Sequence, residues 1–449
     1  MGEPKRVLKV LMLPWLAHGH ISPFLQLAKK LSKRNTFIYL CSTPINLLSV
    51  TKKLSTPYTE SIKLVEINLP TLPNLPPHYH TTNGLPPHLM DTLKEAFKMS
   101  KPELLDIYCS LKPDFVIHDC AVMWVGEVAW SVGIPTIDFV TFSAAFTSFY
   151  LKEMVAPLGE FPFDRIHIHE FENDKVLPVI NGITADDFER VNPTDSCNLR
   201  LIKSSREIEG KYIDYVTRTS KRQVIPIGLL VDQEPLIEDD SLGLIHWLNK
   251  KEKRSCVFVS FGSEYFLTSE EMEEIAHGLE LCNLNFIWVV RVSKEKDGIK
   301  VEDVLPKGFF ERVGERGRVV EGWAPQTMIL SHQSIGGFLS HCGWSSILES
   351  ITFGVPIIAM PMHVDQPLNA RLVVEVGVGL EIEREGTSGK VNREVVAKVV
   401  REVVLGTRGD HVRKKVREIS NDLMSKGEDE IDELTKRLIH INQERKHTM

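Results

Sequence analysis

A turn-to-helix junction near residue 341 carries groups that suit the binding of an anion. The apolar run 336–339 is typical of a strand, and it ends just before His341. Ser345 and Ser346 then begin a helical pattern that continues to about Phe353. The free backbone N–H groups and the positive dipole end of such a helix start attract negative charge. An imidazole and two hydroxyl groups at this point can donate hydrogen bonds as well, so the junction suits a diphosphate.

Residues on either side of this junction extend the pattern. Glu349 lies one turn further into the helix and can accept hydrogen bonds from a ribose diol. Trp323 offers a flat face for a base, and Asp365 with Gln366 can hold sugar hydroxyl groups. The predicted chemistry of this stretch is therefore the recognition of a base, a ribose, a diphosphate and a sugar.

Each of these residues also has a purely structural explanation. Ser346 and Glu349 have the spacing of a capping box, which alone would account for both. Trp323 and Trp344 would serve equally well as packing aromatics, and Asp365 as a loop-forming residue. Their joint occurrence on one stretch favours a binding site over these separate explanations.

A second group of residues, in the first half of the chain, could transfer a proton. His18 and His20 follow the apolar run 7–13, and Asp119 ends a later apolar run. A neutral imidazole accepts a proton near neutral pH, because its unperturbed pKa is about 6.5. The two histidines are equally placed, a histidine after a strand is often structural, and Asp119 could simply cap a loop. His118 is a weaker candidate, because neighbouring side chains of an extended segment point to opposite faces.

These residues need a fold in which strands and helices alternate. Short apolar runs separated by helical patterns are typical of parallel βαβ units with both sheet faces covered. In the first half we expect strands at 7–13, 36–40, 114–117 and 136–140, and helices at 22–31, 93–108 and 126–132. In the second half we expect strands at 255–261, 286–291, 318–320, 336–339 and 355–360, and helices at 270–281, 392–405 and 411–440.

The sequence therefore predicts an α/β protein with two doubly wound, Rossmann-like domains facing each other across a cleft. Residues 1–228 and 251–425 are the expected domains, residues 229–250 a linker, and residues 426–449 a terminal helix that packs back on the first domain. Doubly wound proteins bind ligands beyond the carboxyl ends of their strands. No GxGxxG fingerprint follows the first strand, which argues against a dinucleotide.

Composition narrows the class of protein. The 449 residues carry a formal net charge of −7, which argues against a nucleic-acid partner. Seven scattered cysteines, none in a CxxC pair, favour reduced thiols over disulfides or a zinc site. No window approaches the roughly 18 uninterrupted apolar residues of a membrane span, and no signal-peptide pattern is present. We therefore expect a cytoplasmic protein.

The stretch 323–366 resembles the signature (PSPG) box of the plant family 1 UDP-sugar glycosyltransferases. It keeps the order WAPQ, HCGW, ES, GVP and DQ throughout. The Gly-His near the N-terminus, the turn 261–263 and the segment 305–309 extend the resemblance over most of the chain. The resemblance implies the GT-B architecture, with the acceptor bound mainly by the first domain and the donor by the second.

The resemblance also implies donor contacts residue by residue. Implied around the uracil and ribose are Trp323, Ala324, Gln326 and Glu349; around the diphosphate, Ser263, His341 and Ser346; and around the sugar, Trp344, Asp365 and Gln366. Thr141 is a further implied donor contact. A glutamine at the end of the box is typical of members that use glucose, so we expect UDP-glucose as donor substrate and no permanently bound cofactor. Ser345 replaces the family's usual asparagine, and its shorter hydroxyl can still cap the helix and reach a phosphate.

The catalytic residues follow from the same resemblance. His20 matches the family's base, and Asp119 matches the partner that orients the imidazole and stabilises the imidazolium. The implied reaction inverts the anomeric centre without a covalent intermediate. It needs no metal, and no Asp-x-Asp motif lies near the box.

A narrower resemblance indicates the acceptor. The run 75–88, the opening 14–23 and Ser345 are similar to the branch of the family that adds a sugar to a sugar already carried by a flavonoid, terpenoid or lignan. We therefore expect a monomeric glucosyltransferase of small glycosylated plant metabolites, with residues 151–187 as an acceptor loop. Two alternatives stay open: transfer to a bare aglycone hydroxyl, and a UDP-sugar-binding protein without transfer activity.

Overall fold

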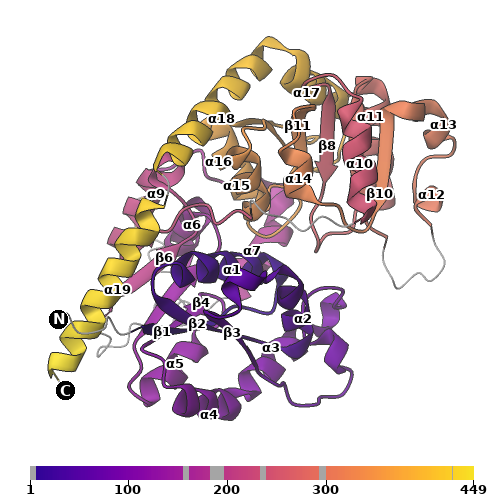
Figure 1. Ribbon diagram of the computed structural model, residues 1–449. Helices are drawn as coiled ribbons and strands as arrows, with labels where there is room; N and C mark the ends of the chain where they lie inside the picture. The colour runs from indigo at the N-terminus through magenta and orange to yellow at the C-terminus, as the bar shows by residue number, and fades with distance from the viewer. Residues whose placement is uncertain are drawn as a thin grey trace. The chain divides into compact units, whose positions relative to one another are not determined.

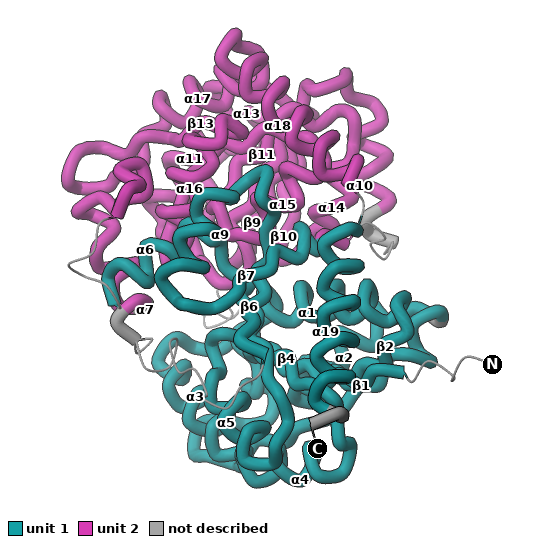
Figure 2. Tube along the Cα trace, turned by 90° about the vertical axis from the view of Figure 1, so that its left-hand side faces the viewer, with its two compact units in different colours: residues 1–158, 183–230, 427–449 teal, residues 159–182, 231–426 magenta. Residues whose placement is uncertain are grey.

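The computed structural model describes residues 7–154, 161–182, 197–232, 239–292, 300–426 and 428–448. These residues form two compact units. Unit 1 comprises residues 1–158, 183–230 and 427–449, and unit 2 comprises residues 159–182 and 231–426 (Figure 2). The segment 161–182 thus belongs to unit 2, although it lies in the first half of the sequence. The expected linker 229–250 and the expected acceptor loop 151–187 lie partly outside the described residues.

Unit 1 is built, in its described part, on a parallel sheet of seven strands in the order β3-β2-β1-β4-β5-β6-β7 (Figure 1). The strands are β1 Leu8–Leu13, β2 Thr36–Ser42, β3 Ile62–Glu66, β4 Phe115–Asp119, β5 Thr136–Val140, β6 Leu199–Ile202 and β7 Gln223–Pro226. The helices are α1 His18–Ser32, α2 Pro44–Lys53, α3 Met90–Met99, α4 Lys101–Leu111, α5 Trp124–Ser131, α6 Ala144–Met154, α9 Arg206–Ser220 and α19 Asp429–Thr448.

Both faces of the unit 1 sheet are covered by apolar helix faces. In β1, Val10 and Met12 pack into the cluster that contains side chains of α1 and α19. Leu11 and Leu13 point the other way, into the cluster formed with α3, α4 and α5. Because successive strand residues alternate between the two faces, a strand buried on both sides needs apolar residues at successive positions. The residues from Val10 to Leu13 meet this need, and Lys9 is the exposed residue of β1.

Unit 2 repeats this plan. Its described residues form a parallel sheet of six strands in the order β10-β9-β8-β11-β12-β13. The strands are β8 Cys256–Ser260, β9 Asn285–Val290, β10 Gly317–Glu321, β11 Ile335–Ser340, β12 Ile357–Ala359 and β13 Gly379–Glu381. The helices are α7 Asn173–Gly182, α10 Asp239–Asn249, α11 Ser269–Cys282, α12 Val301–Val304, α13 Phe309–Val313, α14 Gln326–Leu330, α15 Trp344–Thr352, α16 Gln366–Val376, α17 Arg393–Leu405 and α18 Thr407–Lys426.

The fold class is the one predicted, an α/β protein with two Rossmann-like sheets, but some helix boundaries differ. The expected helix 93–108 is two helices, α3 and α4, that separate at Ser100. Pro102 occupies the first turn of α4, where its missing N–H costs no hydrogen bond. The expected helical stretch 411–440 covers parts of α18 and α19, and the expected terminal helix 426–449 corresponds to α19.

The strand order reverses once in each sheet. In unit 1 the reversal lies between β1 and β4, and in unit 2 it lies between β8 and β11. Loops that leave the carboxyl ends of two such strands diverge to opposite faces of the sheet, and this topological switch point is where open α/β sheets bind ligands. The loops after β1, β4, β8 and β11 are therefore where functional side chains are expected.

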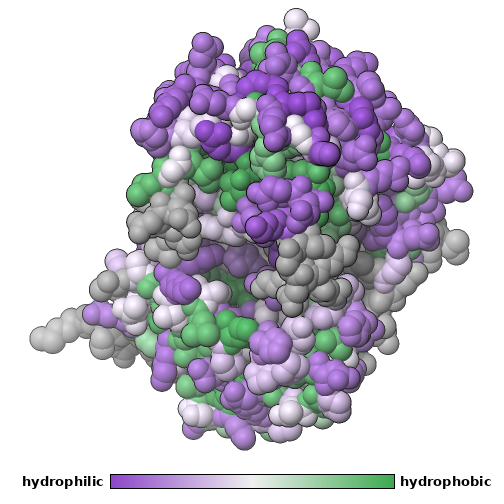
Figure 3. Space-filling view, turned by 90° about the vertical axis from the view of Figure 1, so that its right-hand side faces the viewer, coloured by the Kyte–Doolittle hydropathy of each residue, from purple (hydrophilic) through white to green (hydrophobic). Residues whose placement is uncertain are grey.

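No helix in the described part of the chain is long and apolar enough to cross a membrane. On the face drawn in Figure 3, hydrophilic residues cover much of the surface, and hydrophobic residues gather in smaller groups.

Candidate active site

The switch point of unit 1 holds a hydrogen-bonded His–Asp pair. His20 lies in the first turn of α1, which begins a few residues after β1, and Asp119 is the last residue of β4. The distance from His20 Nδ1 to Asp119 Oδ2 is 2.7 Å. The His20 side chain is 15% exposed and that of Asp119 is fully buried. A proton on Nδ1 donates to the carboxylate, which leaves Nε2 able to accept a proton.

Backbone donors and a hydroxyl hold this pair in place. Asp119 Oδ1 accepts from the amide of Ala121 at 2.9 Å, and Oδ2 accepts from the amide of Trp15 at 3.3 Å. Thr141 Oγ1 lies 3.0 Å from His20 Nδ1. Thr141, expected among the donor contacts, therefore lies beside the His–Asp pair in unit 1. Phe142 contacts the imidazole edge-on, with ring centroids 5.5 Å apart.

The other two histidines near this switch point have different surroundings. His18 Nε2 lies 3.0 Å from the Lys53 ammonium nitrogen. The charge of Lys53 disfavours a positive charge on the His18 ring. His118 is buried, and its Nδ1 faces the carbonyl of Asp119. Its burial lowers the pKa of the ring, and its Nε2 points toward the backbone of Gly126. Geometry thus separates His20, which has the carboxylate partner, from the two alternatives.

The switch point of unit 2 holds an imidazole between two glycine-bearing loops. His341 follows β11 and is 9% exposed. A Cβ atom at Gly262 or at Gly343 would lie 2.5 Å from His341 Nε2, so a side chain at either position would collide with the ring. Burial, and then the neighbouring His363, lowers the pKa of His341 to about 4, so the ring is neutral at physiological pH. Nδ1 is buried and has no hydrogen-bond partner among the described residues.

The start of α15 lies beside His341. Gly343 is the N-cap of this helix and provides no side-chain cap, and the positive end of the helix dipole at this position attracts an anion. Ser345 and Ser346 lie in this first turn. Ser263, which follows Gly262 in the loop after β8, is exposed. Loop amides, hydroxyl groups and the helix dipole at one switch point form an arrangement suited to a diphosphate.

Gln326 ties the ribose side of the candidate donor site to the helix. Its Nε2 donates to Ser346 Oγ at 3.0 Å and to Glu349 Oε2 at 2.8 Å. The capping-box explanation for Ser346 and Glu349 is not what the structure has, because Ser346 is the third helical residue rather than the N-cap. A carboxylate held in this position is of a type that can accept hydrogen bonds from a diol.

The two tryptophans of the box differ sharply in exposure. Trp323 is 60% exposed, as a stacking platform for a base requires, and Ala324 beside it is buried. Trp344 is only 4% exposed, which favours packing as the role of its ring.

Asp365 and Gln366 are held at the start of α16. Gln366 Oε1 accepts from the amides of Met362 and His363, at 3.0 and 3.1 Å. Asp365 Oδ2 accepts from Asn369 Nδ2 at 2.7 Å, and the same Nδ2 donates to the Cys342 carbonyl at 3.0 Å. Asn369 was not among the predicted residues, although its position four residues after Asp365 places it on the same helix face.

Within the described residues there is no group of three or more His, Cys, Asp or Glu side chains that could hold a metal ion.

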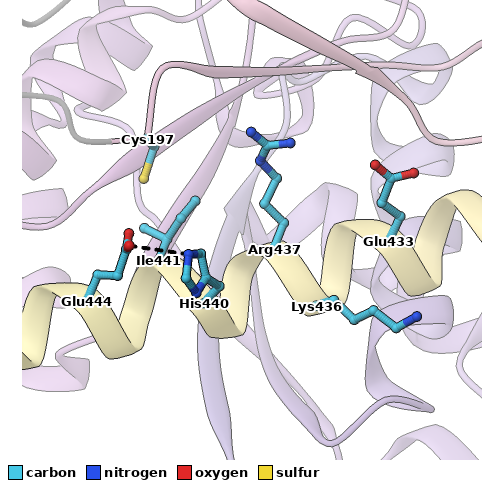
Figure 4. Close-up of a pocket in the computed structure, with 7 residues that line it drawn as sticks. All are labelled: Cys197, Glu433, Lys436, Arg437, His440, Ile441 and Glu444. Atoms are coloured by element: carbon cyan, nitrogen blue, oxygen red, sulfur yellow. Dashed lines mark ion pairs between the residues drawn. The ribbon is translucent and has the colours of Figure 1, made fainter.

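Unit 1 also contains a cavity of about 540 Å³ that is separate from the His20–Asp119 pair. Figure 4 shows its lining, which α19 supplies together with Cys197, including the His440–Glu444 ion pair. Cys197 precedes β6, and Arg437 donates to Gln223 at the beginning of β7. The cavity therefore adjoins the amino ends of the strands, the edge opposite to the one that carries His20 and Asp119.

Comparison with known proteins finds a family match for each half of the chain. Residues 6–230 match the family described as "Glycosyltransferase, N-terminal domain", and residues 238–406 match the one described as "UDP-glucoronosyl and UDP-glucosyl transferase". The chain belongs to the UDP-glycosyltransferase family. This glycosyltransferase is an enzyme that uses a UDP-sugar as donor. His20 and Asp119 fall within the first matched region, and the stretch 323–366 falls within the second.

Individual relatives span nearly the whole glycosyltransferase. It is 50% identical over 438 residues to beta-D-glucosyl crocetin beta-1,6-glucosyltransferase of Gardenia jasminoides, which covers 96% of this chain and 98% of the relative. It is 48% identical over 434 residues to a mogroside IIIx synthase of Siraitia grosvenorii, covering 95% and 91% of the two chains. The fold is that of Glycyrrhiza uralensis UGT73P12 complexed with glycyrrhetinic acid 3-O-monoglucuronide, with a TM-score of 0.84, 22% identity and 98% of each chain covered.

Proposed function

We propose that this glycosyltransferase transfers glucose from UDP-glucose to a sugar hydroxyl of a glycosylated plant metabolite, such as a flavonoid, terpenoid or lignan glycoside, with inversion at the anomeric carbon. The observation that carries the catalytic part is the 2.7 Å contact between His20 and the buried Asp119. The acceptor class rests on the 50% identical relative, which is named for adding glucose to a glucosyl crocetin.

The proposed division of labour gives unit 1 the acceptor and the base. As the acceptor oxygen attacks C1 of the glucose, its proton passes to His20 Nε2. The resulting imidazolium donates from Nδ1 to Asp119, and a buried carboxylate stabilises that charge strongly because little water screens it. Attack from the face opposite the departing UDP inverts the anomeric centre in a single displacement.

In the same proposal, unit 2 binds the donor and the leaving group. The C1–O bond to the diphosphate breaks as the new bond forms, so negative charge grows on the departing UDP. The positive end of the α15 dipole and the neutral His341 are fixed polar groups that stabilise that charge without reorganisation, which is the most effective form of electrostatic stabilisation. Trp323, Gln326 and Glu349 hold the uridine, and Asp365 with Gln366 holds the glucose.

A set of matched acceptors tests this function. The purified protein is incubated with UDP-glucose and with pairs of an aglycone and its monoglucoside, and the released UDP is measured. UDP release with the monoglucosides alone supports sugar-chain extension. Release with aglycones as well or instead would move the target to an aglycone hydroxyl, and no release with any acceptor would leave a UDP-sugar-binding protein.

The proposal also includes a monomeric, cytoplasmic and metal-independent enzyme. Excess EDTA is expected to leave the rate of UDP release unchanged. A loss of activity that magnesium restores would contradict the metal-independent part of the proposal.

A further inference from the structure

The loop that precedes α16 is braced by a segment that is remote in sequence. Residues 161–182 contain the turn η4, Glu170–Glu172, and the helix α7, and they belong to unit 2 (Figure 2). The amide of Val364 donates to the carbonyl of Lys175 at 3.2 Å. Val364 has φ 61°, a left-handed conformation that costs a β-branched residue energy and needs support from its surroundings.

Glu172 anchors this segment to α16 through a buried ion pair. Both of its carboxylate oxygens accept from Arg371 Nη2 at 2.8 Å, and the two side chains are 5% and 6% exposed. Arg371 Nη1 also donates to Glu381 at 2.6 Å. Loss of Glu172 would leave the buried Arg371 guanidinium with one carboxylate partner, Glu381, where it now has two, and a buried charge is sensitive to such a loss.

Arg371 lies on the helix that carries the candidate sugar contacts. Gln366 is the first residue of α16, and Asn369, which fixes Asp365, lies between it and Arg371 on the same helix. The ion pair with Glu172 and the Lys175–Val364 hydrogen bond therefore hold both the helix and the loop before it. None of these contacts touches the residues that face the uridine, namely Trp323, Gln326 and Glu349.

We propose that Glu172 is a positioning residue for the donor sugar, acting through Arg371 on Asp365 and Gln366. This inference rests on the proposed binding of UDP-glucose by unit 2. It predicts that Glu172 contributes to the binding of the glucose moiety and hardly at all to that of UDP, which lacks the sugar.

The test compares equilibrium binding of UDP-glucose and of UDP by calorimetry, so it needs neither an acceptor nor turnover. In Glu172→Gln the dissociation constant for UDP-glucose is expected to rise about tenfold, while that for UDP stays within about twofold. Arg371→Lys keeps the charge but loses the planar guanidinium that contacts Glu172 and Glu381 at the same time, and it is expected to behave in the same way. The conservative Glu172→Asp provides a second variant should Glu172→Gln not fold.

Glu170→Gln is the matched control, because Glu170 lies on the same turn, is exposed and undergoes the same change of charge. It is expected to leave both dissociation constants unchanged. Equal weakening of UDP and UDP-glucose would show general damage to unit 2, and no weakening of either would show that the ion pair does not reach the sugar; both results overturn the inference. Failure of the wild-type protein to bind UDP-glucose would instead overturn the proposed function.

Discussion

The two switch points of this protein have the same strand topology, but the histidine at each has different surroundings at Nδ1. In unit 1 the imidazole of His20 shares Nδ1 with a buried carboxylate 2.7 Å away. In unit 2 the imidazole of His341 is packed between two glycine-bearing loops, and its buried Nδ1 has no hydrogen-bond partner among the described residues. A carboxylate partner raises the proton affinity of a histidine, whereas burial without one lowers it. In the proposed function, the same fold position therefore carries a base in one unit and a neutral anion ligand in the other.

The largest expected effect on this contrast is that of His20→Ala on the turnover number. General-base assistance contributes about 10²–10⁴ in rate, so the turnover number is expected to fall by that factor. UDP binding is expected to stay within about twofold of wild type, since the donor residues lie in unit 2. Steady-state kinetics and UDP calorimetry on the same preparation measure the two quantities.

His18→Ala is the control for this prediction, because His18 is two residues away and lacks the carboxylate partner. Its activity is expected to stay within a few fold of wild type. A His20→Ala variant that retained more than about a tenth of its activity would remove His20 from the mechanism.

His341→Ala is expected to give the reverse pattern. A hydrogen bond to a charged group contributes about 1.5–3 kcal/mol, so UDP affinity should fall by roughly one to two orders of magnitude. The proton-transfer step in unit 1 is untouched, so the pH dependence of turnover at saturating donor should keep its midpoint. Calorimetry with UDP and a pH–rate profile measure these effects. A shifted midpoint with unchanged UDP affinity would mean that the two imidazoles do not have separate functions.

A smaller effect is expected from Glu209, a buried carboxylate in unit 1, and it concerns the free energy of unfolding. Glu209 is fully buried, and it accepts from the amides of Ala144 and Ala145, at 3.0 and 2.8 Å, and from Ser204 Oγ at 2.6 Å. It thereby caps α6, which begins shortly after Thr141 and Phe142, the two residues that contact His20. Burial raises its pKa to about 7, from an ordinary value of about 4.5.

Between these two pKa values the folded protein holds one proton more than the unfolded chain. The free energy of unfolding should therefore fall as pH rises from 4.5 to 7, by up to about 1.4 kcal/mol per pH unit from this residue. Glu381 of unit 2, whose pKa burial also raises to about 7, adds a fall of the same sign. Urea unfolding at several pH values measures this dependence. The free energy of unfolding should fall less steeply with pH in Glu209→Gln than in the wild type. Equal slopes would mean that Glu209 is ionised in the folded protein across this range.

The central strands and the stretch 323–366, called the donor stretch below, could be predicted because neighbouring residues in the sequence are enough to indicate them. The sequence predicts the strand 136–140 with the bounds that β5 has, because β-branched and aromatic residues surround its one charged residue, Asp138. The strand β6 was not predicted, since its four residues include Arg200, which is fully buried against Asp138 at 2.5 Å. An arginine interrupts the apolar pattern, and its ion-pair partner lies 62 residues away.

The candidate site likewise has residues that the sequence could indicate and contacts that it could not. The types and order of His341, Glu349 and Asp365 indicated a nucleotide-sugar site, and the family resemblance selected His20 over His18. The spacing could not reveal that the Gln326 amide joins Ser346 to Glu349. Nor could it reveal Glu172, which meets Arg371 across 199 residues. Contacts of this kind depend on how loops meet in space, and no local pattern encodes them.

The smallest expected effect concerns Ser345, the one position where the donor stretch departs from its family's usual asparagine. Ser345 lies in the first turn of α15 and is half-buried. Restoring the longer amide in Ser345→Asn offers an additional donor to the diphosphate, and a net hydrogen bond contributes about 0.5–1.5 kcal/mol. UDP affinity is therefore expected to rise by no more than about tenfold, with turnover unchanged. Ser345→Ala, which removes the hydroxyl without adding bulk, should weaken UDP binding by a similar or smaller factor. If Ser345→Asn instead bound UDP more weakly than Ser345→Ala, the helix start would be too crowded for the amide, and the serine would be required by the shape of this donor site.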